Sequence, residues 1–109
     1  MPYSVGLTDD AARDLDEIYH YIDRHDVPGK ADYTLGRIEK MLVSLAETPD
    51  RGVHPRELLA LGIREYREVF FKPYRIIYRV VGDSVFVLLI VDGRRDMQPL
   101  LERRLLEAQ

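Results

Sequence analysis

The sequence predicts an α+β fold in which a helical hairpin packs on one face of a small, mostly antiparallel twisted sheet. Two amphipathic helical patterns stand side by side in the first half of the chain, and three strand-like segments follow them. A run of helices followed by a run of strands is typical of α+β proteins. With a short opening strand and a short last helix, the predicted order is β-α-α-β-β-β-α, one domain over residues 1–109.

The first strand and the first helix are predicted from two different periodicities. Tyr3, Val5 and Leu7 alternate with smaller residues, which indicates a short half-buried strand. Thr8 is the expected N-cap of the following helix, and Asp9 begins its first turn, where negative charge is favourable. The apolar stripe that predicts this helix of about 17 residues consists of Ala11, Leu15, Ile18, Tyr19 and Ile22.

The second helix follows a break at residues 26–29. Asp26 or Val27 is the expected cap, because Pro28 is tolerated only near a helix start. Pro49 is expected to end the helix. Its apolar stripe consists of Ala31, Leu35, Ile38, Leu42 and Leu45. Residues 49–62 then read as a loop that has room for one helical turn at 57–61.

Three strands are predicted at residues 65–71, 74–81 and 85–91, with a hairpin turn at 82–84 between the last two. The last of them is apolar on both faces, which indicates a central position in the sheet. Asp96 is the expected cap of a short final helix. The apolar stripe of that helix consists of Leu100, Leu101 and Leu105.

The middle strand provides the candidate site. If the helical hairpin covers the face that carries Tyr74, Ile76, Tyr78 and Val80, the arginines point the other way. Arg75 and Arg79 then stand on the opposite face, roughly 7 Å apart. Together with Lys72, Arg94 and Arg95 they are predicted to form a basic concave surface that binds a target protein or a phosphate.

Other readings of these residues stay open. Alternating arginines also solvate an open sheet face, paired here with Glu65 or Glu68. His20, His25 and His54 are dispersed and do not have the spacing of a helical metal site, so no metal is predicted. No sequence motif indicates a cofactor or a small-molecule substrate.

Composition and charge exclude several classes of protein. The chain has no cysteine, which excludes a disulfide framework, and its longest apolar run, 85–91, is too short to cross a membrane. It shows no secretory signal, so a cytoplasmic protein is expected. Residues 1–50 carry five Lys or Arg and eleven Asp or Glu, whereas residues 51–109 carry eleven and eight. The net charge of −3 therefore combines an acidic first half with a basic second half, which favours a localised anionic partner.

Four segments, in this order and spacing, resemble the RelE/ParE superfamily of toxins from bacterial type II toxin–antitoxin modules. They are ARDLDEIYHYI at 12–22, LAETPDRG at 45–52, PYRIIYR at 73–79 and LIVDGRRD at 89–96. The resemblance covers almost the whole chain. It implies an antitoxin partner whose disordered segment folds onto the toxin.

The two branches of this superfamily imply different chemistry. RelE-like members are ribosome-dependent endoribonucleases, which use basic strand residues and often a Tyr or His near the C-terminus. By resemblance, Arg75 matches the central-strand arginine, and Arg94 or Arg95 matches the one after the last strand. However, residues 96–101 contain no Tyr, His or Lys, and an arginine is a poor base. Among the carboxylates, Glu57 is one option as the base, but neither it nor Glu65 or Glu68 matches a family motif.

The missing aromatic residue and the acidic net charge both favour the ParE-like branch. Several members of that branch poison DNA gyrase, which needs a protein–protein contact and no active site. The favoured function is therefore a gyrase inhibitor neutralised by a cognate antitoxin. The alternatives are a RelE-like mRNA endoribonuclease, with Arg75 and Arg95 as its catalytic cations, and an inactive member that only binds its antitoxin.

Overall fold

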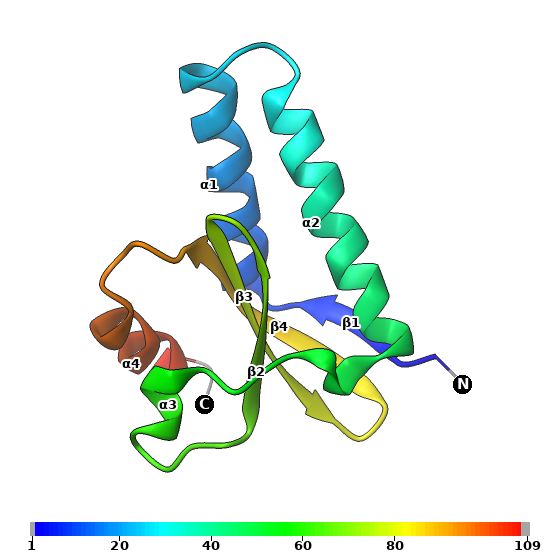
Figure 1. Ribbon diagram of the computed structural model, residues 1–109, viewed down its shortest axis with the longest axis vertical. Helices are drawn as coiled ribbons and strands as arrows, with labels where there is room; N and C mark the ends of the chain where they lie inside the picture. Colours follow the sequence, from blue (N-terminus) through cyan, green and yellow to red (C-terminus); the bar gives the residue numbers. More distant parts are fainter. Residues whose placement is uncertain (1, 108–109) are drawn as a thin grey trace.

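The computed structural model describes residues 2–107 and confirms the predicted order of elements (Figure 1). In order, the elements are β1 (Ser4–Leu7), α1 (Asp9–His25), α2 (Lys30–Glu47), the 3-10 helix η1 (Pro49–Arg51), α3 (Arg56–Leu59), β2 (Tyr66–Phe71), β3 (Tyr74–Val81), β4 (Ser84–Asp92) and α4 (Met97–Glu107). The single turn α3 begins one residue before the helical turn expected at 57–61. No helix in the described range is long and apolar enough to cross a bilayer.

The four strands form one sheet in the order β1-β4-β3-β2. β4 is central, as its apolar character on both faces predicts, and pairs antiparallel with β3 and parallel with β1. The register between β3 and β4 shifts between Ile77 and Tyr78, so that Leu88 has no direct partner on β3. Because Leu88 is the extra residue of this bulge, both Leu88 and Leu89 belong to the apolar cluster on one side of the sheet.

The helical hairpin of α1 and α2 covers one face of the sheet and extends beyond it (Figure 1). Ile38 and Leu45 from α2 and Ala11 from α1 are fully buried against this face. The strand residues that meet them are Val69, Ile76, Tyr78, Val85, Val87 and Ile90. This arrangement confirms which face of β3 the hairpin covers.

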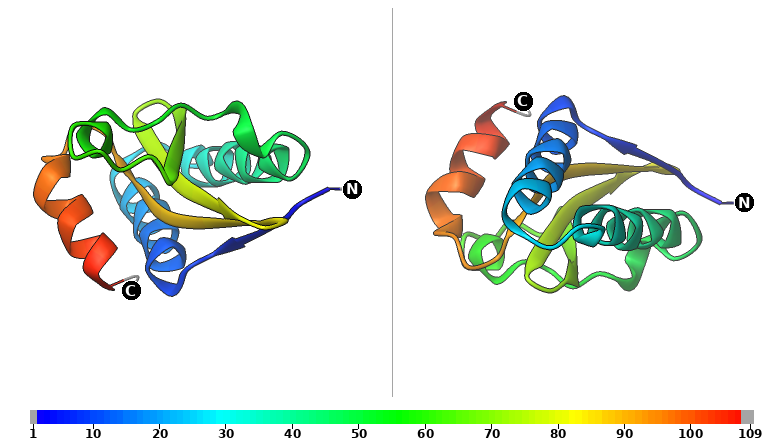
Figure 2. Two further views of the ribbon diagram at one scale, coloured as in Figure 1. Left: turned by 90° about the horizontal axis from the view of Figure 1, so that it is seen from below. Right: turned by 90° about the horizontal axis from the view of Figure 1, so that it is seen from above.

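The opposite face was expected to be open, and over much of its area this expectation is wrong. Leu58 of α3 and Leu101 of α4 pack on it against Ile77 and Leu89. Both small helices place leucines on an apolar strand surface, so burying that surface favours a second layer. Figure 2 shows α4 beside α1, on the side of the molecule away from the N-terminus.

The helix starts confirm one predicted cap and correct another. Thr8 caps α1 as expected, since its hydroxyl accepts a hydrogen bond from the amide of Ala11. The N-cap of α2 is Gly29, and neither Asp26 nor Val27 has this role. Gly29 has a φ of 89°, which a glycine adopts without strain, and its place after Pro28 lets the chain reverse before α2 begins.

An ion pair between Asp14 of α1 and Arg104 of α4 fixes the position of α4. β1 ends at Leu7 while β4 continues to Asp92, which leaves backbone groups of β4 without a neighbouring strand. The Asp14 carboxylate accepts from the amide of Ile90, and Arg104 donates to the carbonyl of Leu88 and to Asp14. Asp14 and Arg104 therefore provide hydrogen-bond partners for the backbone groups of β4 that β1 is too short to reach.

Candidate functional site

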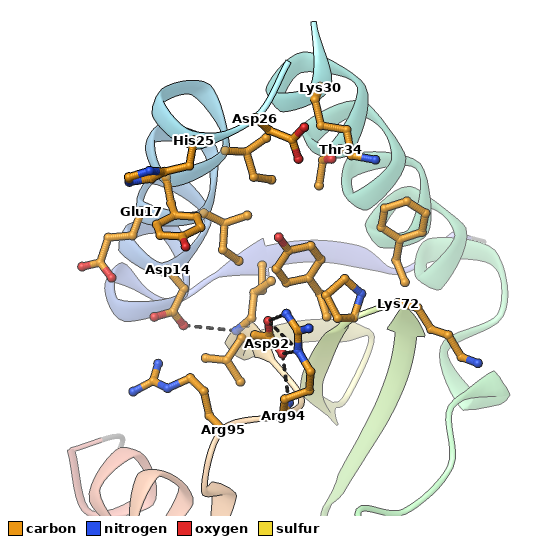
Figure 3. Close-up of a pocket in the computed structure, with 18 residues that line it drawn as sticks. Asp14, Glu17, His25, Asp26, Lys30, Thr34, Lys72, Asp92, Arg94 and Arg95 are labelled. Carbon is orange, nitrogen blue, oxygen red and sulfur yellow. Dashed lines mark hydrogen bonds and ion pairs between the residues drawn. The ribbon is translucent and has the colours of Figure 1, made fainter. Parts of the chain in front are cut away.

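A cleft of about 780 Å³ lies where the end of the helical hairpin meets the β2–β3 turn and the end of β4 (Figure 3). Its floor consists of buried or half-buried residues, namely Ile18, Ile22, Thr34, Phe71, Tyr74, Ile90 and Val91. Its rim carries exposed polar and charged side chains, namely Glu17, Tyr21, His25, Asp26, Lys30, Lys72, Arg94 and Arg95. An apolar floor with a charged rim is the usual composition of a protein or peptide binding site.

The charges of the rim differ in how far they are already neutralised. Arg94 is held by Asp92, with its Nη2 atom 2.5 Å from a carboxylate oxygen, and this contact lowers the pKa of Asp92. Lys72, Arg95 and Glu17 make no ion pair with any residue in the range 2–107. These three charges remain available to a partner in the cleft, and Figure 3 shows Glu17 and Arg95 towards one side of it and Lys72 at the other.

Tyr74 gives the floor of the cleft a neutral polar group. Burial raises the pKa of its phenol above the ordinary value, and the nearby carboxylate of Asp92 adds to this effect. The phenol therefore keeps its proton at neutral pH and can donate a hydrogen bond to a bound partner.

Arg75 lies outside the cleft, in a buried ion-pair cluster with Glu57 and Glu68. Its Nε atom donates to Glu68 at 2.7 Å, and its Nη1 and Nη2 atoms donate to the two oxygens of Glu57 at 2.8 Å. Only 10% of the Arg75 side chain and 5% of the Glu68 side chain are exposed. All three guanidinium nitrogens are thus engaged by carboxylates.

Glu57 stays ionised because of the same cluster. Hydrogen bonds from Arg75 lower the pKa of Glu57 from 4.5 to about 2, and the two carboxylates raise the pKa of Arg75 further above its ordinary value. A carboxylate with so low a pKa, bonded on both oxygens, is a weak proton acceptor at neutral pH. Glu57 is therefore not suited to act as a general base, and together with Glu68 it holds Arg75 in place.

Arg79 lies neither in the cleft nor in the ion-pair cluster of Arg75, but over the ring of Tyr66. Its guanidinium carbon is 5.8 Å from the centre of the Tyr66 ring, and its Nε atom is buried without a hydrogen-bond partner in the described range. Its cross-strand neighbours are Tyr66 on β2 and Phe86 on β4. Neither Glu65 nor Glu68 pairs with it in the range that the structure describes.

The structure therefore divides the five predicted site residues into three groups. Lys72, Arg94 and Arg95 come together at the cleft, Arg75 is enclosed in the ion-pair cluster, and Arg79 lies on the Tyr66 ring. The expected continuous basic surface is not formed. The reason is the unexpected cover of the second sheet face, because α3 brings Glu57 onto Arg75.

Two features of the site were missed in the sequence. One is the role of Gly93, where an added Cβ would lie 2.8 Å from the Cδ atom of Arg75, so the arginine needs a glycine at this position. The glycine in the segment Asp92-Gly93-Arg94 was the available signal. The other is the apolar floor of the cleft, which Phe71 and Tyr74 build from either side of the β2–β3 turn and which no local pattern indicates.

No group of three or more His, Cys, Asp or Glu side chains within residues 2–107 is arranged to hold a metal ion. The three histidines remain dispersed in space as well as in sequence. His20 contacts Asp16, His25 stacks on Tyr21, and His54 bonds the carbonyl of Tyr66.

Comparisons with solved structures confirm the fold. The chain superposes on a chain of the chromosomal ParDE system of Pseudomonas aeruginosa with a TM-score of 0.68 and 24% identity, covering 83% of this chain and 95% of that one. For a chain of the RelBE2 toxin–antitoxin complex of Mycobacterium tuberculosis, the TM-score is 0.61 at 23% identity, with 84% and 99% covered. A variant of the toxin RelE from E. coli in its free state gives 0.63 at 16% identity, with 94% and 98% covered.

Sequence comparisons identify the family. Residues 5–97 match the family model for the ParE toxin of the type II toxin–antitoxin system parDE. Toxin ParE3 of Caulobacter vibrioides is 30% identical over 91 residues, which cover 84% of this chain and 87% of that protein. The chain therefore belongs to the ParE toxin family and is the toxin component of a type II toxin–antitoxin module.

Proposed function

We propose that this toxin inhibits DNA gyrase by direct protein–protein contact, and that a segment of its cognate antitoxin neutralises it by binding in the cleft. The ParE-like branch, which the family match identifies, supports the choice of gyrase over ribosome-bound mRNA as the target. A protein contact of this kind requires no catalytic group.

The observation that carries the choice of target is the enclosure of Arg75. Cleavage of RNA through its 2′-hydroxyl requires a cation that holds the phosphate, as well as a base and an acid. Arg75 is the residue that resemblance places in the cation's role, and Glu57 and Glu68 occupy all three of its guanidinium nitrogens. Binding a phosphate there would require breaking a largely buried ion-pair cluster, which costs several kcal/mol.

The cleft supports the proposal for the antitoxin. An amphipathic segment that places apolar side chains on Ile22, Phe71 and Tyr74 would bury the floor. Its charged side chains would then meet the unpaired Lys72 and Arg95. A related fold comes from a structure described as the toxin–antitoxin complex RelBE2, which is consistent with a protein partner on this scaffold.

A supercoiling assay with purified gyrase tests the target. We expect wild-type toxin at stoichiometric amounts to abolish supercoiling, and mRNA in a translating extract to stay intact. Intact supercoiling together with cleaved mRNA would establish the RelE-like alternative. If neither activity appears and induced expression leaves growth unchanged, the chain is an inactive antitoxin-binding member and the proposal is wrong.

Charge reversal at the cleft tests the antitoxin site separately. With the product of the adjacent reading frame as the probe, Lys72→Glu and Arg95→Glu together should weaken the complex at least tenfold. Arg24→Glu on the exposed surface of α1 is the matched control and should leave affinity within twofold. Equal affinity of the double variant and the wild type would show that the antitoxin does not bind in the cleft.

A further inference from the structure

The part of the second sheet face that α3 and α4 leave uncovered carries an unusual row of residues. Tyr66, Arg79, Phe86 and Gly6 are direct cross-strand neighbours, one on each of the four strands. Phe86 is 42% exposed, and Val81, two residues beyond Arg79 on the same face, is 47% exposed. We refer to Gly6, Arg79, Val81 and Phe86 as the Arg79 strip.

Arg79 differs from the other arginines that lie on the sheet or against it. Arg67 donates to backbone carbonyls, Arg75 to Glu57 and Glu68, and Arg104 to Asp14. The side chain of Arg79 makes no hydrogen bond or ion pair with any residue between 2 and 107, and its Nε atom is shielded from solvent. A guanidinium that is already partly desolvated and unpaired is more favourable for a carboxylate than a fully hydrated one.

The strip also offers an apolar contact next to this charge. Gly6 stands opposite Phe86 and has no side chain, so the ring is left uncovered on that side. A Cβ built at Gly6 meets no heavy atom within 4 Å, which shows that the space over this part of the sheet is open. The positive charge of Arg79 on β3 therefore lies beside the exposed ring of Phe86 on the neighbouring strand β4, and adjacent strands are about 4.8 Å apart.

From this arrangement we infer that the Arg79 strip binds an acidic, extended peptide segment of a partner protein. The segment would place a carboxylate on the Nη edge of Arg79 and an apolar side chain, two residues along, over Phe86 and Gly6. Phe86 lies one strand from Arg79 and Gly6 two strands from it, so the midpoint between Phe86 and Gly6 is roughly 7 Å from Arg79. Residues at positions i and i+2 of an extended chain point to the same side and are also roughly 7 Å apart. This inference goes beyond the proposed function, because the strip lies on the sheet face opposite the helical hairpin, and neither gyrase nor the cleft enters the argument.

A selection from a random 12-residue peptide library displayed on phage tests the inference. The wild-type chain is the target, and Arg79→Gln removes unspecific binders. We expect the selected peptides to share an Asp or Glu followed two positions later by an aliphatic or aromatic residue. A selection that yields no peptide, or peptides without an acidic residue, would overturn the inference.

Three variants then measure affinity for the best selected peptide. Arg79→Gln should weaken binding at least tenfold, and Gly6→Leu should do the same by covering Phe86, since an added Cβ at Gly6 meets no heavy atom within 4 Å. Arg24→Gln, on exposed α1, should leave the affinity within twofold. Because Arg79→Gln could alter the fold, Gly6→Leu provides an independent loss, and unchanged binding in that variant contradicts the site.

The Nε–H resonance of Arg79 in an NMR titration places the peptide directly. It should shift on addition of the selected peptide, since the Nε atom has no partner in the free protein. A shift caused instead by a single-stranded RNA 12-mer, with none caused by the peptide, would assign the strip to nucleic acid and overturn the proposal.

Discussion

Arg75 and Glu57 form a two-point ion pair in which both terminal nitrogens of the arginine lie 2.8 Å from the two carboxylate oxygens of the glutamate. The pair joins α3 to β3, and Glu68 on β2 completes it through the Nε atom of Arg75. Parallel hydrogen bonds of this kind fix orientation as well as distance. α3 is only four residues long, so this pair and the buried Leu58 determine where it sits on the sheet.

Removing the arginine should be strongly destabilising. Arg75→Ala leaves two carboxylates beside each other in a largely buried site, and we expect a loss of about 3–5 kcal/mol in the free energy of unfolding. Urea denaturation followed by circular dichroism measures this loss. Arg56→Ala, next to the cluster but exposed, should change stability by less than about 0.5 kcal/mol. Equal stability of Arg75→Ala and wild type would show that the cluster contributes little.

The same cluster predicts a loss of stability in acid. The pKa of Glu57 is about 2 in the folded protein and 4.5 as its ordinary value. A lowered pKa contributes stability that is present above pH 4.5 and is lost as the pH falls toward 2. Wild-type protein should therefore lose more stability across this window than Glu57→Gln, compared by denaturant melts at several pH values. Parallel curves for the two proteins would contradict a role for Glu57.

The link between Asp14 and Arg104 should control the attachment of α4. Asp14→Ala leaves the amide of Ile90 without its acceptor and Arg104 without its carboxylate, so we expect a loss of about 2–4 kcal/mol. Hydrogen exchange at Ile90 should accelerate in the variant. Asp16→Ala is the control: this residue lies two positions further along α1 and is exposed, so exchange at Ile90 should stay unchanged. Unchanged exchange in Asp14→Ala would show that the Asp14 carboxylate does not protect the amide of Ile90.

Replacement by alanine should change the stability of the fold in opposite directions at two glycines. At Gly52 an added Cβ would lie 2.5 Å from the Tyr78 hydroxyl oxygen and 2.8 Å from the carbonyl oxygen of Glu68, so Gly52→Ala should cost about 2 kcal/mol. At Gly36, inside α2, nothing lies within 4 Å, and Gly36→Ala should stabilise by about 0.5–1 kcal/mol because alanine favours the helix. Thermal melts compare them, and a shift of the same sign in both would contradict this account.

Local sequence patterns predicted most of the fold. The alternation in 74–81 and the stripes of the two long helices identified the elements and the buried face of β3. They could not show that β1 pairs parallel with β4, because this pairing joins residues 80 positions apart. The predicted N-cap of α2 was wrong, because the residue at this position is Gly29, whose left-handed backbone conformation forms the turn after Pro28, and no side chain caps the helix.

The site was harder to predict than the fold. Lys72, Arg94 and Arg95 were expected on one surface with Arg75 and Arg79, whereas the structure places them on the lining of the cleft, because the β2–β3 turn and the end of β4 are adjacent in the sheet. The environment of Arg75 depends on a carboxylate 18 residues earlier, on a single helical turn whose position no periodicity reveals. A long-range partner of this kind decides whether an arginine faces a ligand or is enclosed by the protein itself.

The parallel pairing of β1 with β4 has a consequence for synthesis of the chain. Ser4 finds its partner Ser84 only after most of the polypeptide has been made, whereas α1 and α2 contact each other within the first 47 residues. Contacts between residues so distant in sequence form slowly compared with local ones. The first strand to leave the ribosome is therefore one of the last to be placed. Until β1 is placed, the edge of β4 that it covers lacks its parallel neighbour.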